Sequence, residues 1–385
     1  MKMTTIEVSD PIWNYIESVP KNNVGTTSQD IPLRKSLYSL GFPTHPKVLE
    51  HLRYLKNFLD SEHDTSDLAD VLLAFAFKYR NFKSITNSTS TFISQVWESD
   101  ELEKKCKFSD LLSELEKSGL SEYANIFYPE KAAISDLLKV HDRNYIDKIL
   151  NGTLDPAEER RLGLKWSPEL SNRSFLAVNG TLLTAKLAMK EGIACHVAGG
   201  THHSHFDFGS GYCVFNDLAY TSRSLIENKI ISKVLIFDCD VHQGDGTAKI
   251  LEKNNDIFTC SIHCKNNFPA RKAKSDLDVE LEDNLDSHQY LKILNQTLER
   301  CMNLFNPEFV LYDAGVDIHL NDELGKLKVD DAGLIKRDEI VLQFFKSLSI
   351  PIATVIGGGY SKNKIELAKR HASIFKAAKN IFLED

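Results

Sequence analysis

The stretch KVLIFDCDVHQGDG, from Lys233 to Gly246, begins as an apolar run and ends in polar side chains. Such a run is typical of a strand that is buried on both faces of a parallel sheet. Asp238, Asp240 and His242 follow at intervals of two residues, so on an extended strand their side chains would share one face. Carboxylates this close together repel one another unless a cation neutralises them. Two carboxylates and an imidazole suit a divalent metal, most simply Zn²⁺.

The same residues allow a plainer interpretation. Acidic side chains are common at helix N-termini, where they accept hydrogen bonds from free backbone N–H groups. Asp245 stands just before GTAKIL and could cap a helix in this way. The stretch by itself therefore favours a metal site without excluding a capping cluster.

Four other apolar segments have the same character, and amphipathic helices are expected between them. The predicted strands are Ile193–Gly200, Lys233–Asp240, Ile257–His263, Phe309–Gly315 and Pro351–Gly358. The two clearest helix faces are Leu291, Leu294, Leu298 and Cys301, and Leu334, Val341, Phe345 and Leu348. Continuous apolar strands alternating with helices predict the α/β class, with a mostly parallel sheet covered by helices on both faces.

Polar or reactive side chains follow every predicted strand. These are Thr201, His202 and His203; Asp238, Asp240 and His242; Ser261 and His263; Asp317; and Gly359 and Tyr360. Ligands bind beyond the carboxyl ends of strands in open α/β sheets, so we expect one site here, with Asp317 as a further metal ligand. Tyr360 could donate its hydroxyl to an oxyanion. Taken singly, the tyrosine could instead be a packing residue and the histidines structural ones.

The composition of the 385-residue chain narrows the function classes. Its formal net charge is −8, with both signs scattered, which argues against direct nucleic-acid binding. Seven cysteines without framework spacing fit a reducing compartment. The N-terminus has no apolar signal segment, and the most apolar helical stretch, Leu68–Phe77, is too short to span a bilayer. We therefore expect an intracellular, cytoplasmic protein without membrane contact, or a nuclear one in a eukaryote.

Two regions of the chain differ in character. Residues 1–106 are polar and charged, and Val48, Leu52 and Leu55 recur at helical spacing. This part is predicted to be a helical N-terminal extension or a divergent cap. Residues 107–385 carry all the strand and site signals, and we expect them to form a catalytic domain.

Four segments carry a resemblance to a known family. They are AGGTHHSHFDFGSGYCVFND (Ala198–Asp217), FDCDVHQGDG (Phe237–Gly246), LYDAGVDIHLNDELG (Leu311–Gly325) and IGGGY (Ile356–Tyr360). Their order and spacing are similar to those of the zinc-dependent histone deacetylase family, part of the arginase/deacetylase superfamily. Leu137–Leu170 and Lys265–Leu281 are more like its bacterial and class IV branch. The resemblance covers roughly Lys107 to the C-terminus and implies the three-layer arginase/deacetylase α/β fold.

The resemblance implies a role for each site residue. The implied zinc ligands are Asp240, His242 and Asp317. Asp238 would orient His202, and Asp245 would orient His203. The implied monovalent cation site, for K⁺, consists of Asp238, Ser261 and the backbone carbonyls of Asp240, His242 and Ile262. The implied substrate tunnel is lined by Gly211, Tyr212, Phe268 and Leu324.

The implied activity is hydrolysis of an acyl amide, with an acylated lysine of a protein or peptide as substrate. Zinc would polarise the acyl carbonyl and acidify a bound water. His203 would act as general base and later as general acid, while His202 would give electrostatic support. Tyr360 would stabilise the oxyanion, and the acyl group could be acetyl or longer.

Three other activities are compatible with parts of this pattern. A binuclear ureohydrolase of the same superfamily needs a further carboxylate two residues after His242, where this chain has Gly244. A deacetylase of acetylpolyamines or other small acylated amines would favour a glutamate in place of Leu324. A non-catalytic module that binds acyl-lysine would have lost catalytic residues, and none is substituted here. The identity of the substrate and the oligomeric state are left open.

Overall fold

The computed structural model describes residues 107–120 and 124–383, and this part of the chain contains a six-stranded sheet. The strands are β1 Ile193–Cys195, β2 Val234–Asp238, β3 Ile257–Cys264, β4 Leu277–Leu281, β5 Phe309–Asp313 and β6 Ile352–Val355. They lie in the order β1-β6-β5-β2-β3-β4, and every neighbouring pair is parallel. The expected α/β class with a parallel sheet is therefore confirmed.

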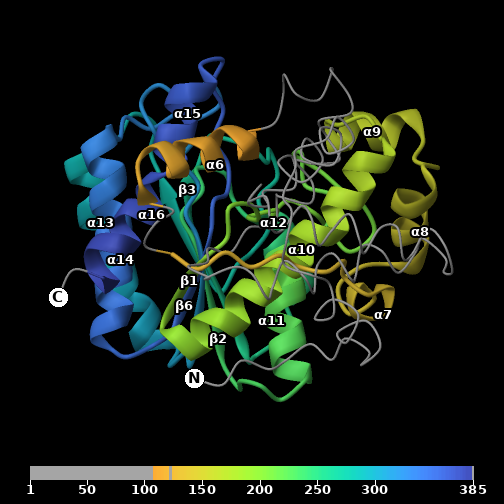
Figure 1. Ribbon diagram of the computed structural model, residues 1–385, viewed down its shortest axis with the longest axis horizontal. Helices are drawn as coiled ribbons and strands as arrows, with labels where there is room; N and C mark the ends of the chain where they lie inside the picture. The colour runs from red at the N-terminus through yellow and green to blue at the C-terminus, as the bar shows by residue number, and fades with distance from the viewer. Residues whose placement is uncertain (1–106, 121–123, 384–385) are drawn as a thin grey trace, which may run out of the picture. The chain divides into compact units, whose positions relative to one another are not determined.

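Helices cover both faces of the sheet, as Figure 1 shows. They are α6 Lys107–Lys117, α7 Ile134–Leu137, α8 Arg143–Asn151, α9 Pro156–Leu162, α10 Pro168–Glu191, α11 Asp217–Glu227, α12 Asp245–Leu251, α13 Ser287–Leu304, α14 Asp331–Ser347, α15 Lys364–His371 and α16 Ser373–Phe382. Alternate strand residues enter two separate cores. Phe237 and Tyr312 pack with α13, α14 and α16, whereas Ile236 and Leu311 pack with α8, α10 and α11. Among the described residues, no helix is long and apolar enough to cross a membrane.

A single asparagine connects the start of α11 to the loop that carries the paired histidines. Asn216 caps α11, because its side-chain oxygen accepts a hydrogen bond from Ala219 N at 2.9 Å. Its side-chain nitrogen donates to His202 O at 3.3 Å and to Ser204 O at 3.0 Å. A cap of this kind stabilises a helix by about 1 kcal/mol. Here it also fixes the backbone on which the histidines stand.

Most predicted strands are shorter in the structure than in the sequence-based prediction. β2 ends at Asp238 rather than Asp240, and β5 ends at Asp313 rather than Gly315. Cys239 N still donates to Asp313 O on β5, but the N–H groups after it bond to aspartate side chains. Asp240 N donates to Asp238 Oδ1 at 3.0 Å, and His242 N donates to Asp240 Oδ1 at 3.0 Å. The prediction that three site residues share one face of a strand is therefore wrong.

Two further elements depart from the prediction. The edge strand β4 is absent from the predicted strands because its sequence, LDVEL, alternates apolar and charged residues and pairs only with β3. Leu348, expected on the apolar face of α14, is the exposed C-cap of that helix. The helical extension expected for residues 1–106 lies outside the described residues.

Candidate active site

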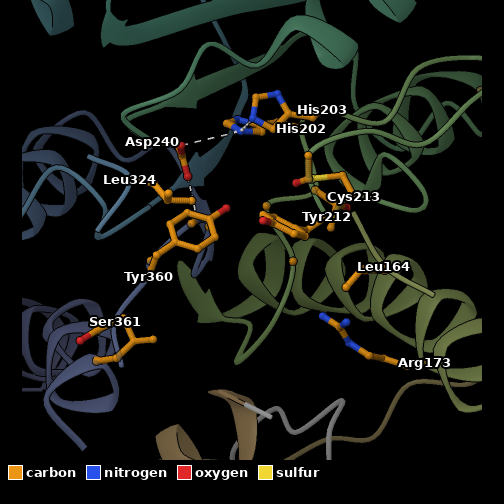
Figure 2. A pocket seen from close by; sticks show the side chains of 18 of the residues that line it. Leu164, Arg173, His202, His203, Tyr212, Cys213, Asp240, Leu324, Tyr360 and Ser361 are labelled. Carbon is orange, nitrogen blue, oxygen red and sulfur yellow. Dashed lines mark hydrogen bonds and ion pairs between the residues drawn. The ribbon is translucent and has the colours of Figure 1, made fainter. Parts of the chain in front are cut away.

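A cavity of about 810 Å³ opens beyond the carboxyl ends of the strands. Its lining includes His202, His203, Tyr212, Asp240 and Tyr360. Figure 2 shows these side chains reaching the cavity from separate loops. The sequence prediction that polar residues after different strands meet at one edge of the sheet is thus confirmed for this group.

Asp240, His242 and Asp317 form a compact buried cluster beside this cavity. His242 Nδ1 lies 3.1 Å from Asp240 Oδ1 and 3.1 Å from Asp317 Oδ2. One donor atom from each of the three residues lies within 4.8 Å of the others. The exposed fractions are 1%, 5% and 0%, respectively. Two carboxylate oxygens and an imidazole nitrogen around one point are a donor set that divalent zinc accepts.

Backbone N–H groups orient both carboxylates of this cluster. Gly358 N donates to Asp240 Oδ2 at 2.7 Å, and Val241 N donates to Asp317 Oδ1 at 2.8 Å. The other oxygen of each carboxylate is thereby directed toward His242. Burial and the charge of Asp240 raise the pKa of Asp317 to about 7. A divalent cation would relieve this repulsion, so the residues present fit the metal.

The paired histidines are each bound to a different aspartate. His202 Nδ1 lies 2.8 Å from Asp238 Oδ2, and His203 Nδ1 lies 2.7 Å from Asp245 Oδ1. The two Nε2 atoms are 3.2 Å apart. A carboxylate only accepts hydrogen bonds, so each Nδ1 carries a proton and each Nε2 is the nitrogen that can exchange one.

The surroundings shift the pKa values of the two histidines in opposite directions. Burial alone would lower the pKa of His202, but the charges of Asp238 and Asp240 raise it well above its ordinary value. Burial and the charge of His202 lower the pKa of His203 to about 4. These surroundings favour the neutral form of His203, which can accept a proton, and the protonated form of His202.

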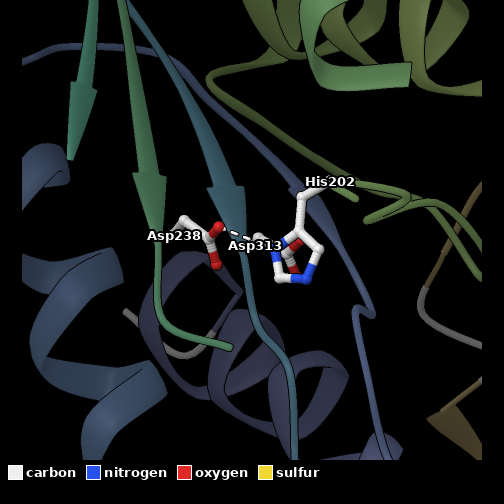
Figure 3. A group of neighbouring side chains, drawn as sticks. All are labelled: His202, Asp238 and Asp313. Carbon is white, nitrogen blue, oxygen red and sulfur yellow. Dashed lines mark hydrogen bonds and ion pairs between the residues drawn. The ribbon is translucent and has the colours of Figure 1, made fainter. Parts of the chain in front are cut away.

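Asp313 is a buried acid that the sequence prediction did not include. It is paired in register with Asp238 across β5 and β2, and it has no exposed surface. Figure 3 shows His202, Asp238 and Asp313 grouped together, with donor atoms within 4.8 Å of one another. Neither Asp313 oxygen has a hydrogen-bond partner among the described residues. Burial, then the charge of Asp238, raises its pKa well above the ordinary value, so this carboxyl favours its neutral form.

Asp245 contacts two histidines and does not cap its helix. It is the first residue of α12, and the N-cap residue, Gly244, makes no side-chain capping bond. Besides His203, Asp245 accepts a hydrogen bond from His205 Nε2, at 3.1 Å. The capping interpretation of Asp245 is therefore wrong, because its carboxylate points to the histidines. His205 could have been found from its spacing, two residues after His203.

Aromatic and apolar residues surround the approach to this cluster. Tyr212, Gly211 and Leu324 line the cavity. Phe268 is not among its lining residues but packs edge-on against the His203 ring, with centroids 4.8 Å apart. Gly211 has φ +53°, and a Cβ there would lie 2.5 Å from His203 Cδ2. Only glycine lets this wall approach the histidine so closely.

Comparison with known proteins gives a consistent result. The family model described as "Histone deacetylase domain" matches residues 101–376. An uncharacterized protein of Picosynechococcus is 42% identical over 276 residues, covering 72% of this chain and 92% of the relative. Histone deacetylase 2 of Arabidopsis thaliana is 30% identical over 335 residues, covering 84% and 83%. The acetoin utilization protein AcuC of Staphylococcus aureus is 28% identical over 264 residues, covering 61% and 68%.

Proposed function

The chain belongs to the histone deacetylase family, and from this premise we propose that it is a zinc-dependent hydrolase that removes acetyl or longer acyl groups from the Nε amine of lysine in proteins or peptides. Membership of the family supports a deacetylase activity. The observation that carries the finer proposal is the position of the Asp240–His242–Asp317 cluster next to the histidine pair. A Lewis acid, a proton acceptor and a hydroxyl donor are the groups that a metal-assisted amide hydrolysis uses.

In the proposed reaction, each polar residue of the site has its own role. Zn²⁺ held by Asp240, His242 and Asp317 would supply Lewis acidity at the acyl carbonyl. His203 Nε2 would accept the proton of the attacking water and return it to the leaving amine. Asp245, bound to His203 Nδ1, keeps Nε2 as the atom that exchanges the proton. The charge on His202 would stabilise the negative charge that develops nearby.

Tyr360 is the proposed donor to the oxyanion. Burial and the charge of Asp240 raise the pKa of its hydroxyl well above the ordinary value, so the group keeps its proton across the working range. A neutral hydroxyl can donate a hydrogen bond when the acyl oxygen becomes negative. Its ring lies 5.9 Å from that of Tyr212, measured between centroids. Tyr212 and Phe268 would enclose the extended lysine side chain between aromatic walls.

We further propose a monovalent cation, K⁺, beside the zinc. Asp238 and Ser261 would supply side-chain oxygens, and Asp240, His242 and Ile262 would supply backbone carbonyls. The register supports this assignment, because Asp238 and Ser261 are paired residues of β2 and β3. The cation would offset part of the negative charge that Asp238 adds next to the zinc site.

Three broader assignments belong to the same proposal. Residues 107–385 would form the catalytic domain, with residues 1–106 as a helical extension or cap. The chain would belong to the bacterial or class IV-like branch, which the similarity to a cyanobacterial protein and to AcuC supports. An intracellular location is supported by five buried cysteines of the described residues that form no disulfide, Cys213, Cys239, Cys260, Cys264 and Cys301.

The geometry at Gly244 weighs against a binuclear ureohydrolase, and Leu324 weighs against a polyamine deacetylase. A binuclear site would need a carboxylate at Gly244, but a Cβ there would lie 2.5 Å from Asp238 Oδ2. Deacetylation of acetylpolyamines or other small acylated amines is the alternative function. Leu324, on the cavity wall, has no charge with which to bind a second ammonium group.

A panel of substrates tests the proposed function. Zinc-loaded protein would be assayed with acetyl-, longer acyl- and trifluoroacetyl-lysine peptides and with acetylpolyamines. We expect hydrolysis of acyl-lysine peptides, with about a hundredfold loss of kcat in Tyr360→Phe. Activity on acetylpolyamines alone would support the alternative. No hydrolysis of any acyl amide would rule out the enzymatic proposal in favour of a binding module.

A further inference from the structure

The position of Tyr360 depends on contacts outside its own loop. It follows Gly357, Gly358 and Gly359, and Gly357 adopts φ +55°. Glycine loses more conformational freedom on ordering than any other residue, so this loop does not hold itself in place. Gly358 is held by Asp240 and Val316, but the Tyr360 ring only lies 6.1 Å from His242 between centroids, which does not fix the backbone of Tyr360.

Two adjacent acidic residues hold the backbone on either side of this tyrosine. Tyr360 N donates to Asp322 Oδ2 at 2.7 Å. Glu323 N donates to Tyr360 O at 3.1 Å. Lys362 N donates to Glu323 Oε1 at 2.6 Å. Because three hydrogen bonds reach the same short loop, we call Asp322 and Glu323 the carboxylate clamp.

The carboxylate clamp is also attached to a proposed zinc ligand. Asp322 Oδ1 accepts hydrogen bonds from Leu324 N and Gly325 N, each at 2.9 Å, which closes a tight turn. Gly325 packs so closely on Asp317 that any Cβ would overlap the Asp317 carbonyl oxygen. The turn that holds the tyrosine backbone thus rests on the backbone of the metal ligand.

We propose that Asp322 and Glu323 are positioning residues that set the place of the Tyr360 hydroxyl relative to the Asp240–His242–Asp317 cluster. The inference rests on the proposed function, in which this hydroxyl stabilises the oxyanion. A catalytic donor that shifts by about 1 Å loses much of its effect on the rate. Both carboxylates act through Tyr360, and neither exchanges a proton with the substrate.

Amide hydrogen exchange tests the carboxylate clamp without any reference to activity. The amides of Tyr360 and Lys362 are expected to exchange at least about tenfold faster in Asp322→Ala and Glu323→Ala, respectively. Glu323→Gln keeps an acceptor oxygen and is the matched control, with exchange close to wild type. Glu323 is exposed, so its variants are expected to fold even where Asp322→Ala does not. Unchanged exchange in the alanine variants would overturn the inference.

A double-mutant cycle then tests the connection to the hydroxyl. Asp322→Ala is expected to lower kcat by about tenfold, with KM and zinc content unchanged. In a Tyr360→Phe background the same substitution is expected to lower kcat by less than about twofold. Equal losses in both backgrounds would show a general structural role and overturn the inference. Glu323→Ala is tested in the same way, alone and in the Tyr360→Phe background. If wild type hydrolyses no acyl amide, the proposed function fails and the catalytic part of the inference with it.

Discussion

Two buried clusters of charged side chains lie near the C-terminal end of β5, and only one of them is balanced by an arginine of the chain. Arg337, on α14, donates to Asp338 Oδ1 at 2.9 Å and to the carbonyl oxygens of Ala314 and Gly315, at 3.0 and 2.5 Å. The Tyr312 hydroxyl donates to the same Asp338 at 2.7 Å. This cluster pairs one cation with one anion and satisfies their hydrogen bonds.

The second cluster, beyond the carboxyl ends of the strands, has only histidines as partners for its carboxylates, and His242 must lose its proton when it binds a metal. Asp238, Asp240 and Asp317 are all within 4 Å of a histidine nitrogen, and in the described part of the chain they form no ion pair with lysine or arginine. Asp313 adds a fourth buried carboxyl group. A buried charge without a partner is costly, so such a cluster is retained where a ligand completes it. The comparison separates a structural ion pair from a binding site.

The largest effect is expected from removing a ligand in the unbalanced cluster. Asp317→Ala is expected to lower kcat/KM by about a thousandfold or more and to lower the zinc content. The substitution removes one of the two carboxylates that hold His242 in place, at 3.1 Å from its Nδ1. Metal analysis and steady-state kinetics measure the two quantities. Full zinc occupancy in the variant would break the comparison.

In the balanced cluster, removing the arginine is expected to lower the stability of the protein. Arg337→Ala leaves Asp338 buried without its cation and is expected to cost about 3 to 5 kcal/mol in the free energy of unfolding. Urea denaturation of the metal-free proteins measures this loss, and Lys336→Ala, at an exposed neighbouring position, is the control. If Arg337→Ala unfolds at the same urea concentration as wild type, the cluster has no structural role.

A smaller loss of activity is expected from a substitution at Tyr360, which lies beside the unbalanced cluster but is not a proposed metal ligand. Tyr360→Phe removes only the hydroxyl, so zinc content and stability are expected to stay at wild-type values. The value of kcat is expected to fall by about a hundredfold, because one donor to the oxyanion is lost. A variant that loses zinc as well would place the tyrosine in the metal site rather than beside it.

Zinc affinity of the unbalanced cluster is expected to depend on pH. In the metal-free protein, burial and Asp240 raise the pKa of Asp317 to about 7. Burial would lower the pKa of His242, but its bonds to Asp240 and Asp317 raise it to about 10. Both groups must lose a proton before they bind metal, so affinity increases as pH rises, by about tenfold per pH unit for each proton displaced. Chelator competition at pH 6, 7 and 8 measures this slope, and a flat profile would contradict it.

The smallest effect is expected at Asp313. Its pKa is raised well above the ordinary value by burial and by Asp238, which favours the neutral form, and Asn is a close substitute for that form. Asp313→Asn is expected to change the free energy of unfolding by less than about 1 kcal/mol and to leave zinc content unchanged. A loss as large as that of Arg337→Ala would mean that Asp313 is ionised and paired with a bound cation.

The contrast also shows what a sequence can and cannot reveal. The apolar run that ends at Asp238 predicts a buried strand, and the chemistry after it predicts the site, because both signals are local. Arg337 cannot be recognised as buried, since it lies in the polar-looking helix segment KRDE. Asp313 ends a strand and has no ligand spacing to identify it. The carboxylate clamp depends on backbone contacts between segments 38 residues apart, which no local pattern encodes.

Titration of metal-free wild-type protein with Zn²⁺ tests the central claim most directly, namely that one metal ion completes the unbalanced cluster of a lysine deacylase. Activity toward an acetyl-lysine peptide would be measured after each addition. The expected result is a rise in proportion to added zinc that stops at one ion per chain. Absence of hydrolysis at saturating zinc, or a rise that continues to two ions per chain, would contradict the claim.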